Sequence, residues 1–288
     1  MTIPEVVIVR TKKGRKYAEF IAKEINLAGH CCGITTIVDL KEYLNENKCS
    51  SDKTIIHSRT AHPNYIYQVL KSLEDEGYRV INSSKAIRLT SDKFNSCRFA
   101  KENNIPCAET IKTDKKDGIS KVKEKIREWD NVIVKPITSR GQGEFCFKFN
   151  KDNINDLEVI NSIPGKGLVV QKYLEYQRLS RMIVVGYKSL EKAVFYDEPG
   201  SGWKCSVCLN PKIKQDKGPS KELLNFAEDV ARKFKSEICF VDIFTSSGKY
   251  ILNEINTACS LVIHERISHY NISKEIAKYL LNPNKNYE

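Results

Sequence analysis

The stretch ICFVDIFTSSGKYILNEIN, from Ile238 to Asn256, reads as two β-strands joined by a short turn at residues 246–249. Side chains alternate between the two faces of a strand. The pattern therefore places Asp242 with its two flanking phenylalanines on one face of the first strand. It groups Leu252, Glu254 and Asn256 on one face of the second strand. The stretch thus predicts a hairpin with two carboxylates on an otherwise apolar surface.

Folding this hairpin about Gly248 sets Asp242 opposite Glu254. Like charges that face each other across a sheet are destabilising, and a buried unpaired carboxylate costs more. A hard cation resolves the conflict, and Mg²⁺ is held by one or two carboxylates together with substrate phosphates. A solvent-exposed acidic face on a surface hairpin is the alternative that the stretch alone leaves open.

The whole chain has 288 residues, of which 41% are hydrophobic. This length suits two or three small lobes, each with its own core. No apolar run approaches the ~20 residues that span a bilayer. At the N-terminus the apolar segment precedes the positive charges, which is the reverse of a signal peptide. We therefore expect a cytoplasmic protein.

The ten cysteines fit this expectation. Several, including Cys146 and Cys239, stand in predicted apolar strands, and we expect them to be reduced core residues. The Cys-x-x-Cys pair Cys205 and Cys208 lacks a second pair or histidines at zinc-site spacing, so we interpret both as thiols.

The net charge of +11 and the pI of about 9.0 predict an anionic partner. The Lys and Arg residues are spread along the chain and form no nucleic-acid recognition motif. A nucleotide or an acidic substrate is therefore a better fit than nucleic acid.

The N-terminal third alternates strands with helical patterns, which is typical of a parallel α/β lobe. We expect strands at 6–10, 35–38, 54–57 and 79–82 and helices at 16–28 and 65–76, with the lobe ending near residue 83. The first turn, residues 11–15, has one glycine and reads as a solvated basic turn. Arg59 follows the third strand at its carboxyl end, where α/β sheets bind ligands, and is a substrate-site candidate.

The pair Ser91 and Asp92 reads as the N-cap of a helix from Lys93 to Asn103. A lysine in a first helical turn opposes the helix dipole. An anionic phosphate near Lys93 would explain its position, and a surface lysine is the alternative.

The middle of the chain predicts a linker strand near 109–111, a helix at 120–129 and a strand at 131–136 that ends in Lys135 and Pro136. The glycine-bearing segment 138–144 and a return strand at 145–149 follow. A small loop between two strands can bring backbone N–H groups close to phosphates. We favour an ATP-covering hairpin over a plain β-hairpin here.

Towards the C-terminus we expect a strand at 167–174, paired strands at 181–186 and 192–196, and an irregular segment at 197–218. A helix capped by Ser220 runs to residue 234, and a terminal helix covers 273–281. Irregular segments of this length are usually functional or disordered.

The order of these features resembles ATP-grasp enzymes, and above all the RimK-type glutamate ligases. The resemblance covers residues 81–261 and rests on six features in this order: a helix lysine, a strand lysine with a glycine loop, Val-Gln-x-x-Leu-Glu, an arginine-led strand, Val-Asp-Ile and Asn-Glu-Ile-Asn. The resemblance implies an ATP-grasp fold behind an N-terminal α/β domain. Its domains would cover residues 1–83, 84–170 and 171–288.

The resemblance also implies the nucleotide contacts. Lys93 and Lys135 would bind the α- and β-phosphates. The flexible loop over the β- and γ-phosphates would include Ser139, Arg140, Gly141 and Gly143. Adenine would be bound by the backbone of Gln171, Lys172, Tyr173 and Leu174, and the ribose by Glu175.

On the reacting side, the resemblance implies that Arg181 stabilises the acyl phosphate and that Lys204 assists it. Ser206 and Arg59 would contact substrate. The metal ligands would be Asp242, Glu254 and Asn256, which suit two Mg²⁺ ions, with Mn²⁺ as an alternative. The implied function is an ATP-dependent carboxylate–amine ligase that joins an amino acid such as glutamate to a small-molecule, peptide or protein acceptor. Relatives of this type are often homo-oligomers.

The chain departs from the family pattern on the substrate side. Leu179 stands where the family has aspartate before the arginine, and Ser206 stands where asparagine is common. A small-molecule kinase on the same scaffold, similar to inositol-phosphate kinases, and a nucleotide-binding regulator without catalysis are the alternatives.

Overall fold

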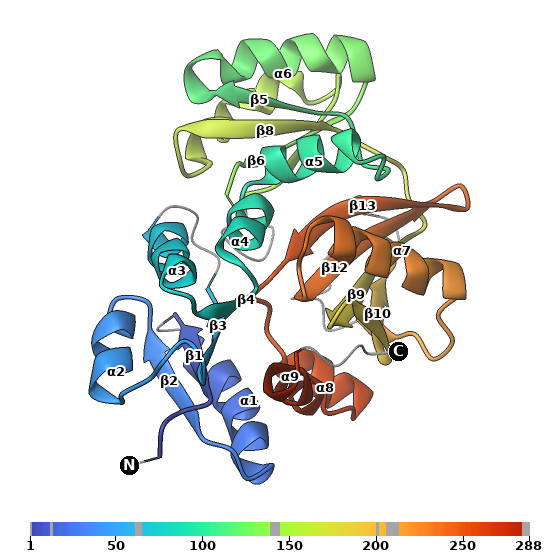
Figure 1. Cartoon of the computed structure of the whole chain (residues 1–288). Coiled ribbons are helices and arrows are strands. Elements are labelled where there is room, and N and C mark those ends of the chain that lie inside the picture. The colour runs from blue at the N-terminus through green and yellow to red at the C-terminus, as the bar shows by residue number, and fades with distance from the viewer. Residues whose placement is uncertain are drawn as a thin grey trace.

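The computed structural model describes residues 2–11, 14–60, 65–138, 145–199, 202–205 and 213–283. Its strands form three sheets that follow one another along the chain, with helices packed on them (Figure 1). The predicted mixed α/β class with a parallel sheet at the N-terminus is confirmed. No helix in these residues combines the length and the apolar character that crossing a bilayer requires.

The N-terminal sheet is parallel, with strand order β2-β1-β3-β4. Its alternating apolar residues bury both faces, as expected for a sheet covered by helices. Helix α1 covers one face, and α2 and α3 cover the other. The elements are β1 (Val6–Arg10), α1 (Arg15–Leu27), β2 (Cys32–Thr36), α2 (Leu40–Glu46), β3 (Ile55–Arg59), α3 (Tyr65–Asp75) and β4 (Arg79–Ile81).

The second strand begins three residues earlier and ends two residues earlier than the predicted range of 35–38. Thr36 ends the strand because its hydroxyl donates to the Asp39 carboxylate over 2.6 Å, which starts the turn into α2. Val38 lies in this turn and is 73% exposed. The run of β-branched residues was therefore misleading, and α2 was missed.

The central sheet is antiparallel, with order β5-β8-β6-β7. The strand expected as a linker near 109–111 is β5, an edge strand of this sheet, so the linker interpretation was wrong. Helix α6 packs over the sheet and begins at Lys115, five residues before the expected start. The elements are α4 (Ser84–Ser91), α5 (Lys93–Glu102), β5 (Thr110–Asp114), α6 (Lys115–Trp129), β6 (Val132–Pro136), β7 (Phe147–Phe149), the 3₁₀ helix η1 (Ile154–Ser162) and β8 (Gly167–Lys172).

The third sheet has order β11-β10-β9-β12-β13 and is antiparallel. Helix α7 covers one face, and α9 packs near the other (Figure 1). The predicted caps of α5 and α7 are confirmed, since Asp92 accepts from the Asn95 N–H and Ser220 from the Leu223 N–H. The elements are β9 (Arg178–Val185), β10 (Lys188–Asp197), β11 (Lys214–Gln215), α7 (Lys221–Lys233), β12 (Ile238–Ser246), β13 (Lys249–Asn256), α8 (Val262–Ser268) and α9 (Ile272–Leu281).

The hairpin predicted from Ile238 to Asn256 is β12–β13, and its expected register of Asp242 opposite Glu254 is confirmed. Ser247 and Gly248 form the turn with φ values of 48° and 74°. Positive φ at both central residues is the geometry that joins twisted strands most closely.

The prediction that Leu252 shares a face with Glu254 was wrong. The register shifts between Asp242 and Ile243, so Ile243 pairs with Leu252 and one extra residue of β13 bulges out. Leu252 therefore joins Ile243 in the apolar core under α7, while Glu254 stays on the face of Asp242.

Side chains and main chain tie the three sheets together at the hairpin. The buried Asn82 amide donates to the Ile238 carbonyl over 2.6 Å and accepts from the Ile238 N–H over 2.9 Å. The Leu252 N–H donates to the Pro106 carbonyl over 2.7 Å. One apolar core also joins the N-terminal sheet, α9 and the third sheet. The hairpin is thus fixed against both other lobes.

The three expected domains each contain one sheet, but the boundaries are not sharp. Strand β8 of the central sheet runs to Lys172, beyond the expected boundary at residue 170. Helix α9, at the C-terminal end, packs against α1 of the first lobe (Figure 1). The division into domains therefore stays a proposal.

Candidate active site

Lys93 is the first residue of α5, and its position is fixed on both sides. Its backbone N–H donates to the Ile137 carbonyl over 2.9 Å, which holds the helix start against the end of β6. Its ammonium group forms an ion pair with the Glu254 carboxylate, although the two residues are 161 positions apart. The Lys93 side chain is only 13% exposed. A surface lysine, the alternative weighed above, does not describe this residue.

Arg181 and Asp242 form a buried ion pair on adjacent strands β9 and β12, where they stand in register. The guanidinium donates from Nε to Oδ1 and from Nη2 to Oδ2, each over 2.7 Å. The two residues are 3% and 4% exposed. This two-point geometry fixes the orientation of both groups and is the strongest form of an arginine–carboxylate contact.

The charges of this network act on both carboxylates. Burial raises the pKa of Asp242, and the Arg181 guanidinium limits that rise. Burial also acts to raise the pKa of Glu254, but the combined charges of Lys93, Lys135 and Arg181 lower it below its ordinary value. Glu254 is therefore held as a carboxylate by the surrounding cations.

The proposed metal ligands can be tested for their fit to Mg²⁺. Asp242 and Glu254 face each other across the hairpin, and Asn256 pairs with Phe240 next to them. Carboxylate and amide oxygens are hard ligands of the kind that Mg²⁺ prefers. Within the described residues, no group of three or more His, Cys, Asp or Glu side chains could hold a metal by itself. The oxygen set fits a magnesium site that shares its coordination with a bound phosphate.

Lys135 lies on β6 of the central sheet and is buried. Its ammonium group donates to the Gln171 side-chain oxygen over 2.8 Å, and the Gln171 amide in turn donates to the Thr110 hydroxyl over 3.1 Å. These hydrogen bonds orient the Lys135 side chain towards Gln171 on β8. Gln171 was predicted for its backbone, and its side-chain role was missed.

Cys146 shows how the separate motifs converge. Burial raises the pKa of its thiol, the charges of Lys135, Lys204 and Lys93 act to lower it, and the Glu254 charge acts to raise it. The prediction that Cys146 lies inside a strand was wrong, because β7 begins one residue later. The nine described cysteines form no disulfide with one another, and their reduced state stays a prediction.

The segment expected to bind adenine begins at the end of β8. The backbone N–H groups of Lys172 and Tyr173 donate to the carbonyls of Glu109 and Asn131 over 2.8 and 3.0 Å. These two N–H groups are therefore engaged within the protein. An adenine contact would fall to carbonyl oxygens or to Leu174. Glu175, which follows, is exposed, and its contact with the ribose stays a prediction.

The remaining predicted residues divide into three cases. Ser139, Arg140, Gly141, Gly143 and Ser206 lie outside the described residues. Lys204 is exposed, and its charge reaches the Cys146 thiol. Arg59 is buried at the end of β3 and donates to the Cys259 carbonyl, in the segment that follows the hairpin.

His264 on α8 was not singled out from the sequence, because no motif surrounds it. It is fully buried, and its ring lies edge-on to Phe195 at a centroid distance of 4.7 Å. Its Nδ1 donates to the Ser260 carbonyl over 2.8 Å. Burial, reinforced by the Arg181 charge, lowers its pKa to about 4, so it stays neutral beside the arginine at pH 7.

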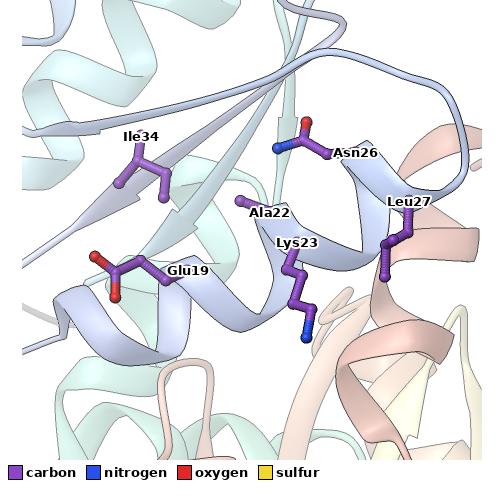
Figure 2. A pocket seen from close by; sticks show the side chains of 6 residues that line it. All are labelled: Glu19, Ala22, Lys23, Asn26, Leu27 and Ile34. Atoms are coloured by element: carbon purple, nitrogen blue, oxygen red, sulfur yellow. The ribbon is translucent and has the colours of Figure 1, made fainter.

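A separate hollow of about 450 Å³ lies between α1 and β2 of the N-terminal lobe. Figure 2 shows its lining, in which Glu19, Lys23 and Asn26 belong to α1 and Ile34 to β2. None of the predicted site residues lines it. We therefore assign it no role in the chemistry.

Three sheets, a magnesium-type oxygen set on the third sheet and the two lysines Lys93 and Lys135 of the central lobe define an ATP-grasp ligase, a carboxylate–amine ligase that consumes ATP. The family model of the RimK-like ATP-grasp domain matches residues 90–280, and the chain belongs to this family.

A curated relative is the coenzyme γ-F420-2:α-L-glutamate ligase of Methanocaldococcus jannaschii, which is 24% identical over 266 residues, covering 88% of this chain and 90% of the relative. Among solved structures, the ATP-grasp ligase PsnB, in complex with a phosphomimetic variant of its minimal precursor, Mg and ADP, has a TM-score of 0.72 at 13% identity and covers 98% of this chain and 99% of its own. The D-alanine–D-alanine ligase of Bacillus anthracis has a TM-score of 0.65 at 15% identity and covers 96% and 94%.

Proposed function

We propose that this ligase activates a substrate carboxylate as an acyl phosphate and couples it to the amino group of an amino acid such as glutamate. The observation that carries the proposal is the paired network of Lys93, Glu254, Asp242 and Arg181, drawn from α5, β13, β12 and β9. These groups provide fixed cations and carboxylates at one place. Phosphoryl transfer needs such positioned charges more than it needs covalent chemistry by the protein.

Nucleotide binding would reorganise this network. Lys93 and Lys135 each have a partner within the protein, a carboxylate and an amide oxygen. ATP phosphates would compete for both ammonium groups. In the proposed bound state Lys93 leaves Glu254 for a phosphate, and Glu254 becomes available to a cation. The Lys93–Glu254 ion pair would thus take the place of the phosphate and metal contacts that these two residues would make in the ATP-bound enzyme.

We propose Asp242, Glu254 and Asn256 as the residues that would hold magnesium, with two ions as the preferred number and Mn²⁺ as a substitute. When bound, the metal neutralises charge on the phosphates of the nucleotide. Arg181 would stay anchored to Asp242, and its guanidinium charge would stabilise the oxygens of the acyl phosphate. Fixed donors of this kind stabilise charge that develops in the transition state.

The reaction then proceeds in two steps. The substrate carboxylate attacks the γ-phosphorus of ATP, and ADP leaves. The amine attacks the acyl carbon, loses a proton and expels inorganic phosphate, so that an amide remains. Glutamate is the first amine to test, because the M. jannaschii relative is named as a glutamate ligase. Self-association remains a prediction, which light scattering would test.

The test is a substrate-dependence assay. Purified protein is incubated with ATP, Mg²⁺ and L-glutamate, with and without a panel of carboxylic acids. We expect ADP and free phosphate in equal amounts only when both a carboxylate and an amine are present. Phosphate retained on the product would instead support the kinase alternative. Nucleotide binding without ADP release under all conditions would support the regulator.

A further inference from the structure

Two arginines stand side by side at the carboxyl ends of neighbouring strands in the N-terminal sheet. Arg10 ends β1 and Arg59 ends β3, and the two residues are paired in the parallel register. Adjacent strands lie about 4.8 Å apart, and paired residues of parallel strands project from the same face. The face is that of Ile8 and His57, which is turned towards α1 and the third sheet.

Both guanidinium groups have buried N–H groups without an acceptor. Arg59 is 5% exposed, and its Nη1 has no hydrogen-bond partner among the described residues. The Nε of Arg10 is buried and unpartnered in the same sense. No carboxylate in the described part of the chain forms an ion pair with either residue. Arg10, which is partly buried, donates from Nη1 to the Thr11 carbonyl over 3.3 Å, and Arg59 donates to the Cys259 carbonyl, so each charge has a backbone acceptor but no counter-ion. A buried charge without a counter-ion is costly, and two like charges in register on a sheet add to that cost.

The place of this pair in the topology points independently to a ligand. The strand order β2-β1-β3-β4 means that the chain leaves β1 on one side and later returns on the other. Between β1 and β3 the direction of the connections therefore reverses. In open α/β sheets, ligands bind outside the carboxyl ends of the strands at such a switch point. Arg10 and Arg59 occupy this position.

Arg59 also links the switch point to the proposed reaction centre. Its Nη2 donates to the Cys259 carbonyl, three residues after Asn256 in the chain. Three residues span at most about 11 Å. The carboxylate of Glu265 on α8 and the Tyr17 hydroxyl on α1 act on the charge of Arg59 from further away, and burial lowers its pKa to about 10, so it stays charged at pH 7. A substrate could therefore reach from the switch point to the hairpin.

We propose that Arg10 and Arg59 form a carboxylate-binding subsite, which holds a substrate carboxylate that is not itself activated. The inference rests on the proposed ligase function, in which one carboxylate is phosphorylated and any other must be held elsewhere. Arginine forks match carboxylates in two-point geometry. The ligand class is a small di- or tricarboxylate or an amino acid, and the subsite would select for it.

The experiment measures probe binding by calorimetry to full-length protein saturated with Mg²⁺ and a non-hydrolysable ATP analogue. The probes are L-glutamate, L-glutamine, L-isoglutamine and glutarate. In Arg59→Gln and Arg10→Gln we expect affinity for the bound probe to fall about tenfold or more, since each removes a charge-assisted contact. The double variant should lose little beyond the weaker single variant, because both arginines would hold one carboxylate. Arg127→Gln, an exposed arginine on α6, is the matched control and should bind as wild type.

The probes identify the carboxylate. L-glutamine lacks the side-chain carboxylate of glutamate. If its affinity is the same for the wild type and the arginine variants, the arginines bind the side-chain carboxylate. L-isoglutamine lacks the α-carboxylate, and the same result with this probe means that the arginines bind the α-carboxylate. Arginine-dependent binding of glutarate alone assigns the acid substrate. Any of these supports the subsite. Unchanged affinity in both variants, or no probe binding to the wild type, overturns it.

Thermal unfolding separates binding from a structural role. A melting temperature that falls in Arg59→Gln and Arg59→Lys with unchanged probe affinity would mean that Arg59 only tethers the Cys259 segment, and would overturn the subsite. Failure of the ligase function is read separately. If probe binding depends on the arginines but no amide forms, the proposed function is wrong and the subsite stands. If both variants form the amide with wild-type kinetics, the proposed function stands and the subsite is wrong.

Discussion

Charged side chains at the hairpin and at the N-terminal switch point differ in whether they have a counter-ion. Around the hairpin every buried charge named above has a partner, since Arg181 bonds Asp242 and Lys93 bonds Glu254. At the switch point Arg10 and Arg59 have no ion-pair partner in the described chain, and each has one buried nitrogen whose N–H finds no acceptor there, although each also donates to a backbone carbonyl. In the proposed function the Lys93–Glu254 ion pair would open when a nucleotide binds, whereas in the proposed subsite the two arginines would receive an anion without breaking an ion pair. The two proposals therefore differ in whether an existing ion pair has to be broken for the ligand to bind.

The largest effect should come from Glu254→Gln, which removes the carboxylate that Lys93 and the proposed metal share. We expect ADP formation to fall by at least about 10²–10³-fold, because a fixed charge at the transferring phosphate is lost. The fold should persist, since the side chain is 25% exposed. ADP release by a coupled assay checks the rate, with the exposed Glu222→Gln as control. If Glu254→Gln forms ADP at the wild-type rate, Glu254 is not part of the active site.

Asp242→Asn and Arg59→Gln compare the two clusters directly. Asp242→Asn leaves the buried Arg181 charge without a counter-ion, and we expect the free energy of unfolding to fall by about 3–5 kcal/mol. Arg59→Gln removes a charge that has no ion-pair partner. The loss of unfolding free energy should stay below about 2 kcal/mol, which is the cost of leaving the Cys259 carbonyl without its hydrogen-bond donor. Urea denaturation of both variants measures the difference. Equal losses would erase the distinction between the clusters.

The pH dependence of stability should report His264. Its pKa is about 4 in the folded protein, against an ordinary value of 6.5, so the unfolded chain binds the extra proton between these values. Stability from this group is complete above pH 6.5 and is lost as pH falls towards 4, by about 3 kcal/mol at the end of the window.

His264→Phe should flatten this profile, measured as unfolding free energy at pH 7 and pH 5. His57, whose pKa burial lowers to about 3, remains in both proteins, so their difference isolates His264. The variant His30→Gln, at a side chain that is 41% exposed, is the control. A slope identical to wild type in His264→Phe would show that other groups cause the acid loss.

The smallest effect is expected at Gln171, which holds Lys135 through its side-chain oxygen. Gln171→Leu leaves the buried lysine without this acceptor, and we expect the KM for ATP to rise about five- to tenfold with little change in kcat. Steady-state kinetics measures both constants, and the exposed Gln177→Leu is the comparison. A fall in kcat at constant KM would contradict the orienting role.

How far the sequence reached can be seen at the hairpin. Alternation and a Ser-Gly turn were enough to predict both strands and the register of Asp242 and Glu254. The bulge that moves Leu252 to the other face was not predictable, because it depends on the core under α7. Helices α2, α4 and α8 were missed for a related reason, since short helices are stabilised mainly by tertiary packing.

The sequence by itself determined the class of chemistry, because residue types and their order identify lysines for phosphates and oxygens for a cation. Only the tertiary structure decided which charges meet. Lys93 and Glu254 are 161 positions apart, and Arg10 and Arg59 become neighbours only through the parallel register of β1 and β3. Coulomb energy and desolvation depend on distance and burial in space. A string of residues therefore names the charges but does not say which of them are left without a partner.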